Sequence, residues 1–137
     1  MKANELMIGN IVGYSSLTRM VTAINPPYFI DLGNSERTTI TNVCIEHLNP
    51  IPITEELLAK NGFKREYDCI CEYTYYIREI DGYFVEVKIG CSNMGDEYVN
   101  CHIDNCDRNS VASADIQYVH QIQNLLSIMN IKFDIKL

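Results

Sequence analysis

The amino-acid sequence predicts an α+β fold, and three patterns support this prediction. Residues 1–50 contain short β-branched and aromatic runs separated by turn residues at a spacing of about ten, which is typical of a small all-β unit. Residues 67–103 alternate apolar and polar side chains, as half-buried strands do. Residues 116–130 repeat apolar side chains at helical spacing. We therefore expect an SH3-like β-barrel or meander in residues 1–50, followed by an α+β unit in residues 51–137.

The composition of the 137-residue chain is that of a globular protein. Apolar residues make up 47% and charged residues 21%, a balance that does not favour disorder. The length suits one compact domain or two small units that share a core. No apolar run reaches the ~18 residues of a membrane helix, and residues 1–10 lack the apolar stretch of a secretory signal. A cytoplasmic location is therefore expected.

The formal net charge is −7, and the sequence contains no cluster of basic residues. Proteins that bind DNA or RNA draw much of their affinity from Lys and Arg side chains that neutralise phosphates. The acidic balance therefore argues against nucleic acid as the main partner, although it is compatible with a small local basic patch.

The first unit is expected to consist of short strands. Residues 11–14, 17–24 and 28–32 are rich in side chains that favour strands, and two more strands are expected within residues 38–45. Ser15-Ser16 separates the first two strands as a turn.

A short helix is expected at residues 55–61. Thr54 can accept a hydrogen bond from a free amide of the first turn, and Glu55 suits the positive end of the helix. Gly62 fits the left-handed position that follows the last turn.

A β-hairpin is expected at residues 67–89, with its turn at Asp81-Gly82. A two-residue type I′ turn would pair odd with even positions, whereas a type I turn with a glycine bulge pairs odd with odd positions. The bulged turn would place Ile77 beside Val85 on one apolar face. We therefore expect the bulged turn, with Gly82 at positive φ.

The six cysteines allow two interpretations. Cys69, Cys71, Cys101-His102 and Cys106 suggest zinc, but C-x-C is tighter than the usual zinc knuckle, and disulfides are not expected in a cytoplasmic protein. Alternatively, Cys69, Cys71 and Cys101 are buried apolar fillers on strand faces, with Cys101 in a strand at residues 97–103. We favour the second interpretation, and we expect no metal and no cofactor.

A second helix is expected at residues 114–129, with Ser113 as its N-cap and Asn130 in a left-handed conformation at its end. Its apolar side chains share an arc of roughly 120° and should cover the sheet. Residues 131–137 alternate apolar and charged side chains, which predicts a half-buried edge strand.

The polar face of this second helix contains no charged side chain. It consists of Gln117, His120, Gln121, Gln123, Asn124 and Ser127. The face is either solvated, or partly buried against the N-terminal half or a second subunit, or a ligand site that uses His120 with Asn124. Amides and a neutral imidazole tolerate burial when they are hydrogen-bonded. Partial burial predicts that His120 and Asn124 are buried, with partners in the N-terminal half or another subunit.

Three segments resemble landmarks of a family of small uncharacterised proteins that gut anaerobic bacteria encode, often in prophages or other mobile elements. The segments are MKANELMIGNIV, LNPIPITEELLAKNGF and IQYVHQIQNLLSIM. The family pattern is similar to E-L-R-I-G-N-x-V, I-P-L-T-E-E-x-L-x-x-x-G-F and V-H-Q-L-Q-N-L, in this order. Met7 stands where the pattern has Arg, and neither the cysteines nor residues 131–137 belong to it. The resemblance implies a mobile-element origin and transfers no activity.

The sequence contains no recognisable catalytic motif of the dinucleotide-binding, P-loop, serine-hydrolase or metalloprotease type. We therefore expect a non-enzymatic protein-binding or accessory module with a protein partner or self-association. The candidate interaction surface is the uncharged helix face with His120, Gln121, Asn124 and Gln117, or the tyrosine-rich hairpin, where Thr74, Tyr76 and Phe84 would share an exposed face. One alternative is a nucleic-acid-associated small barrel. Another is an enzyme with scattered groups such as His120, His102 and Asp104.

Overall fold

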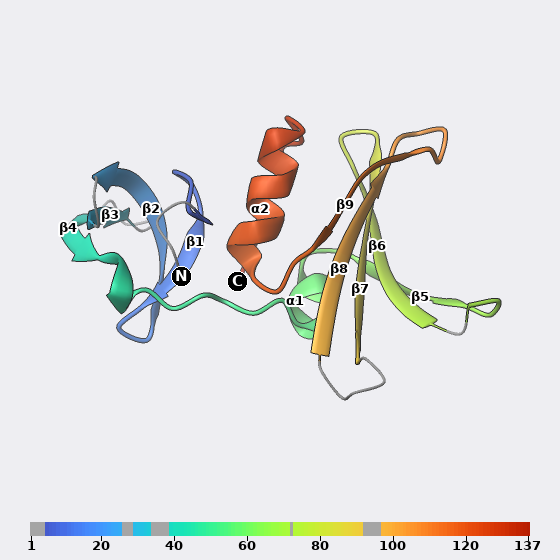
Figure 1. Cartoon of the computed structure of the whole chain (residues 1–137), viewed down its shortest axis with the longest axis horizontal. Coiled ribbons are helices and arrows are strands. Elements are labelled where there is room, and N and C mark those ends of the chain that lie inside the picture. The colour runs from blue at the N-terminus through green and yellow to red at the C-terminus, as the bar shows by residue number, and fades with distance from the viewer. Residues whose placement is uncertain (1–4, 26–28, 34–38, 72, 92–96) are drawn as a thin grey trace. The chain divides into compact units, whose positions relative to one another are not determined.

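A computed structural model describes residues 5–25, 29–33, 39–71, 73–91 and 97–137 (Figure 1). The chain divides into two compact units, Met1–Pro52 with Tyr118–Leu125, and Ile53–Gln117 with Leu126–Leu137. The fold is α+β: antiparallel sheets of four and five strands are accompanied by two α-helices. The α+β class predicted from the sequence is therefore confirmed.

The sheet of the first unit is an antiparallel meander. Its strand order follows the chain: β1 (Ile11–Tyr14), β2 (Leu17–Asn25), β3 (Phe29–Gly33) and β4 (Thr39–Cys44). Ser15 and Ser16 form the expected turn, with φ of 47° and 62°. The described part of this sheet is open. After β4, the chain comes back beside β1, where Asn49 forms an isolated antiparallel bridge with Gly13.

A single strand stands where two were expected within residues 38–45. β4 is followed by a 3-10 helix, η2 (Ile45–His47). The Asp31 carboxylate accepts the N–H of Asn42 at 2.9 Å, and Asn42 has a φ of 56°. This local bond allows a bulge inside one strand. Tyr28 and Thr38, at the ends of expected strands, lie outside the described residues.

The core of the first unit consists of alternate side chains on one face of the meander, joined by residues before β1 and after β4. It contains Leu6, Val12, Val21, Ile30, Leu32, Val43, Ile45 and Leu48. Their burial removes apolar surface from water, which is the main force that stabilises such a small sheet.

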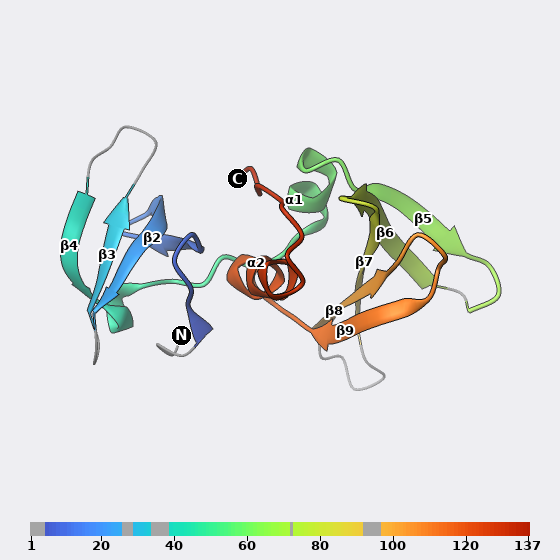
Figure 2. The ribbon, with the colours of Figure 1, turned by 90° about the horizontal axis from the view of Figure 1, so that it is seen from above.

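The sheet of the second unit has five antiparallel strands in chain order, where three or four were expected (Figure 2). They are β5 (Lys64–Asp68), β6 (Tyr73–Ile80), β7 (Tyr83–Cys91), β8 (Glu97–Asp104) and β9 (Ser110–Asp115). Val99, Cys101 and Ile103 of β8 are buried on one face, as predicted. β5 was expected as part of one long strand with β6, and β9 begins before the predicted helix start.

The predicted bulge in the β6–β7 hairpin is wrong. Ile80 pairs with Tyr83, and both Asp81 and Gly82 have positive φ, of 50° and 79°. These values define the two-residue type I′ turn, whose twist matches that of the flanking strands. Even positions of β6 therefore face odd positions of β7, so that Tyr76 rather than Ile77 lies on the buried face with Val87.

Helix α1 (Glu55–Lys60) begins and ends as its sequence predicts. Thr54 Oγ1 accepts the N–H of Leu57 at 3.2 Å. Gly62 has a φ of 76°, and the N–H of Phe63 returns to the carbonyl of Leu58. This pair of features is the Schellman ending, which a glycine accommodates without strain.

Helix α2 (Val119–Ile128) begins five residues later than predicted. Ser113 lies in β9 and is not an N-cap. The cap is Tyr118, whose N–H donates to Gln121 Oε1 at 3.1 Å, in the manner of a capping box. Asn130 ends the helix with a φ of 57°, as expected, while the N–H of Ile131 returns to the Leu126 carbonyl.

Residues 131–137 do not form the predicted edge strand. Their backbone is bound by side chains instead of by a neighbouring strand. Lys132 N–H donates to the Asp81 carboxylate at 2.8 Å, and Lys136 N–H donates to Asn61 Oδ1 at 2.7 Å. The side chain of Phe133 contacts the ring of Phe63 edge to face, with 6.0 Å between centroids. The apolar side chain of Phe133 is therefore packed inward as the alternation predicts, although the segment does not pair with a strand.

Candidate functional site

The uncharged face of α2 forms hydrogen bonds to N-terminal residues of the first unit. Asn124 Nδ2 donates to the Glu5 carbonyl at 2.7 Å, and Asn124 Oδ1 accepts from Asn10 Nδ2 at 2.8 Å. Gln123 Oε1 accepts the N–H of Ile11 at 2.9 Å. The expectation that Asn124 has partners in the N-terminal half is confirmed. Asn124 is half-buried, which is less than the substantial burial predicted. Partial burial with hydrogen bonds explains why amides suit this face better than charged groups do.

His120 is buried as predicted, with 1% of its surface exposed. Its ring stacks on Tyr118 at a centroid distance of 5.8 Å. The hydrogen-bond partner expected for His120 is not found, because neither ring nitrogen has one among the described residues. Burial lowers the pKa of His120, an effect that the Glu5 carboxylate partly opposes. Gln121 is half-buried, and the backbone carbonyl of Gln117 accepts from Ile53 N–H at 3.0 Å.

This burial predicts a pH-dependent loss of stability. Burial disfavours the protonated form of His120 in the folded protein, whereas an unfolded histidine protonates near pH 6.5. The folded pKa is depressed, so protons bind preferentially to the unfolded state as the pH falls below about 6.5. We expect the free energy of unfolding to fall as the pH drops below about 6.5. His120→Gln should flatten this part of a urea-unfolding pH series, and His47→Gln, at an exposed position, should not. Equal slopes in all three proteins would contradict the prediction.

The prediction that Thr74, Tyr76 and Phe84 share an exposed face of the hairpin is wrong. Tyr76 has only 4% of its surface exposed, because the type I′ register turns the even positions of β6 toward the core. Phe84 lies on the opposite face of the sheet and is half-buried, with the Arg108 guanidinium carbon 3.5 Å from its ring centroid. Thr74 is also half-buried. Tyr76 and Phe84 therefore do not form one surface.

The face of the second sheet opposite Val85, Val87 and Cys101 carries a polar pocket of about 380 Å³. We define the polar pocket by its lining residues, which come from β6, β7 and β8: Tyr73, Glu86, Lys88, Asn100, His102 and Asp104. Strand pairing brings them together, since Glu86 lies opposite His102 and Lys88 lies opposite Asn100.

The polar pocket is electrostatically mixed. His102 Nε2 lies 2.9 Å from Asp104 Oδ1, and Lys88 Nζ lies 3.2 Å from the ring centroid of Tyr73. Partial burial raises the pKa of Glu86, and the neighbouring His102 opposes this shift. The sequence proposed His102 and Asp104 as members of a scattered site, and these two are paired, whereas His120 belongs to the first unit. The pocket residues were missed because they occupy outward positions whose grouping depends on the register.

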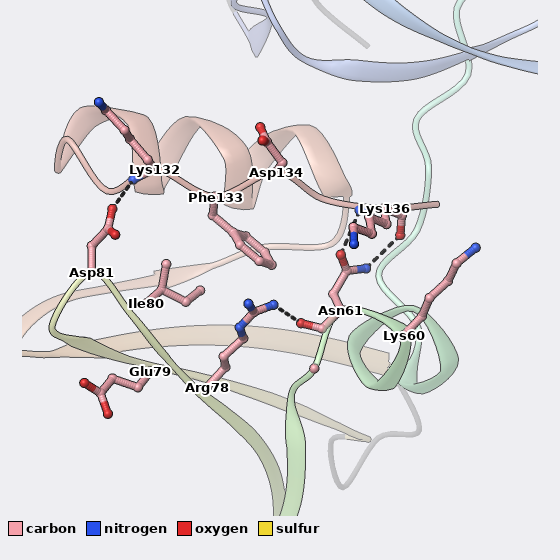
Figure 3. Close-up of a pocket in the computed structure, with 11 residues that line it drawn as sticks. Lys60, Asn61, Arg78, Glu79, Ile80, Asp81, Lys132, Phe133, Asp134 and Lys136 are labelled. Carbon is pink, nitrogen blue, oxygen red and sulfur yellow. Dashed lines mark hydrogen bonds between the residues drawn. The ribbon is translucent and has the colours of Figure 1, made fainter. Parts of the chain in front are cut away.

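A second pocket in the same unit, of about 550 Å³, lies between the C-terminal segment and the β6–β7 hairpin (Figure 3). Arg78 donates to the carbonyl of Asn61 and lies 4.8 Å from the ring centroid of Phe133. Asp81 accepts from the backbone of Lys132. Its central groups are thus engaged in holding residues 131–137.

An apolar surface lies on the first unit, where several large side chains are more than a third exposed: Met7, Ile8, Leu17, Met20 and Phe29. The N–H of Gly9 donates to the carbonyl of Val21 at 2.8 Å, which places the turn at residues 7–10 beside the strand that carries Met20. We define the apolar patch as Met7, Ile8 and Met20.

The cysteines are divided between two environments. Cys101 is fully buried, as expected, and burial raises its thiol pKa to about 12. The prediction for Cys69 and Cys71 is wrong, because both are exposed in the turn between β5 and β6. The Asp68 carboxylate accepts the N–H of Cys71 at 3.0 Å and shapes this turn. Within the described ranges, no three His, Cys, Asp or Glu side chains are grouped so as to hold a metal ion.

Comparison of the chain with protein-family models, curated proteins and solved structures finds no match. The resemblance to the mobile-element family therefore stays a prediction. Among the described residues, no helix has both the length and the apolar character required to cross a membrane.

Proposed function

We propose that the protein is a non-enzymatic protein-binding module, and that the apolar patch contacts the partner. The observation that carries this proposal is Ile8, which projects from a fixed turn with 69% of its surface exposed. Grouped, exposed apolar side chains are typical of interaction sites. The patch carries no charge, so the matching surface of the partner protein is expected to be apolar. An accessory role in a prophage or other mobile element is part of the proposal and rests on the resemblance.

The turn that carries the apolar patch is held by a buried side chain. Asn10, with 3% of its surface exposed, accepts the N–H of Met7 through Oδ1 at 2.7 Å. Its Nδ2 donates to Asn124 of α2. Gly9 takes a φ of 94°, which L side chains rarely adopt. The turn is thus pre-organised, and little conformational entropy is lost when Ile8 contacts a partner.

The double substitution Ile8→Ser with Met20→Ser tests the proposal. Both side chains are exposed, so each change should alter the free energy of unfolding by less than about 0.5 kcal/mol. We expect capture of a partner from host extract, quantified by affinity purification with mass spectrometry, to fall by about tenfold or more.

The matched control is Ile70→Ser. Ile70 is 88% exposed and lies in the second unit, so this variant removes an exposed apolar side chain elsewhere and should capture the partner as the unmodified protein does. Equal capture by all variants would reject the apolar patch. A dimeric mass in light scattering that the double substitution abolishes would instead identify the partner as a second copy.

A further inference from the structure

We infer that the polar pocket of the second unit binds a neutral saccharide. This inference goes beyond the proposed function, since it concerns a different surface and a different unit of the chain. It rests on the lining of the pocket and on an aromatic ring on the same face of the sheet.

The lining residues include both hydrogen-bond donors and hydrogen-bond acceptors. Glu86 and Asp104 accept, Lys88 donates, and the Asn100 amide does both. A sugar hydroxyl also donates and accepts, so adjacent hydroxyls can pair with such a lining. An anion would meet two carboxylates, and an apolar ligand would cover half-buried polar groups without offering them partners, which is unfavourable. A neutral polyhydroxyl ligand fits this chemistry best.

The polar side chains are held in place before a ligand arrives. Asn100 Nδ2 donates to Asp115 at 3.0 Å, and His102 is paired with Asp104 at 2.9 Å. All lining residues stand on strands of one sheet. Groups fixed in this way lose little freedom on binding, which favours recognition of a small ligand. A volume of about 380 Å³ lies within the usual range for small-molecule sites.

An aromatic ring stands beside the pocket. Tyr98 pairs with Gly90 across β7 and β8, two residues from Asn100 on the same face. A Cβ atom at Gly90 would lie 2.8 Å from Tyr98 Cζ and 2.7 Å from its hydroxyl oxygen. The ring therefore lies directly against the glycine, and Tyr98 remains 37% exposed. The exposed side of this ring offers an apolar surface for the C–H face of a sugar, next to the hydrogen-bonding groups.

Saturation-transfer NMR on the full chain tests the inference, with maltotetraose, cellotetraose and tetra-N-acetylchitotetraose each at up to about 10 mM. We expect transfer to at least one of them. Asn100→Ala and Tyr98→Ala should each weaken its binding by about tenfold or more. Tyr67→Ala removes a ring that is 62% exposed on the other face of the sheet and should leave binding unchanged.

The absence of transfer from all three oligosaccharides would overturn the inference. Binding by the Asn100 and Tyr98 variants that is as strong as that of the unmodified protein would overturn it as well. Displacement by inorganic phosphate would indicate an anion site and would also overturn it. A high-mannose glycoprotein, compared before and after removal of its glycans, separates a glycan carried by a protein from a free saccharide. The apolar-patch substitution leaves the polar pocket intact, so failure of either proposal can be recognised separately.

Discussion

Replacement of Asn124 by Leu should lower the free energy of unfolding by about 2–4 kcal/mol, because the buried Asn10 and the half-buried Glu5 lose their hydrogen bonds to it. The Glu5 carbonyl and the Asn10 side-chain amide would both be left without the contacts they now make at 2.7 and 2.8 Å. Leucine is similar in size, so the loss reflects missing hydrogen bonds more than a cavity. Urea unfolding measures the change, provided that the slope of the transition is the same in the variant and the unmodified protein.

Ser127→Ala is the control for Asn124→Leu. Ser127 lies on the same helix and is exposed, so its replacement should change stability by less than about 0.5 kcal/mol. A similarly small effect of Asn124→Leu would show that the polar face of α2 does not stabilise the first unit. A double-mutant cycle with Asn10→Ala would then separate the bond between the two amides from the other contacts of each.

The elements predicted correctly are those whose signals lie within a few residues. Thr54 caps α1, while Gly62 and Asn130 take the left-handed conformation expected of them. Each of these depends on a short side chain or a missing Cβ next to a helix end. The uncharged face of α2 was compatible with solvation, partial burial or a ligand site, and the bond from Asn124 to the Glu5 carbonyl supports partial burial.

The predictions that failed depended on partners distant in sequence. β6 carries apolar or aromatic side chains at both odd and even positions, so periodicity did not decide which of Tyr75 and Tyr76 is buried. The register through Asp81-Gly82 decides this. β9 consists mostly of small residues, which give a weak strand signal. The polar pocket was invisible for the same reason, because Glu86 and His102 meet only when β7 and β8 are aligned.

Asn61→Ala should release the C-terminal segment and lower the free energy of unfolding by about 2–4 kcal/mol. Asn61 is buried, with 5% of its surface exposed. Its Nδ2 donates to the carbonyls of Leu57 and Lys136, both at 2.8 Å. Its Oδ1 accepts from the N–H of Lys136, and both contacts with Lys136 are drawn in Figure 3. The Asn61 side chain thus binds both the N–H and the carbonyl of Lys136. These two bonds take the place of the neighbouring strand that was predicted for residues 131–137.

Hydrogen exchange distinguishes release of this segment from general destabilisation. In Asn61→Ala, the amide of Lys136 should exchange much faster, while amides in the centre of β7 should change only as far as global stability does. Lys136→Ala is the matched control, because Asn61 binds the backbone of Lys136 and not its side chain. Its amide protection should persist. Persistent protection in Asn61→Ala as well would mean that Phe133, packed against Phe63 and Arg78, holds the segment without the amide.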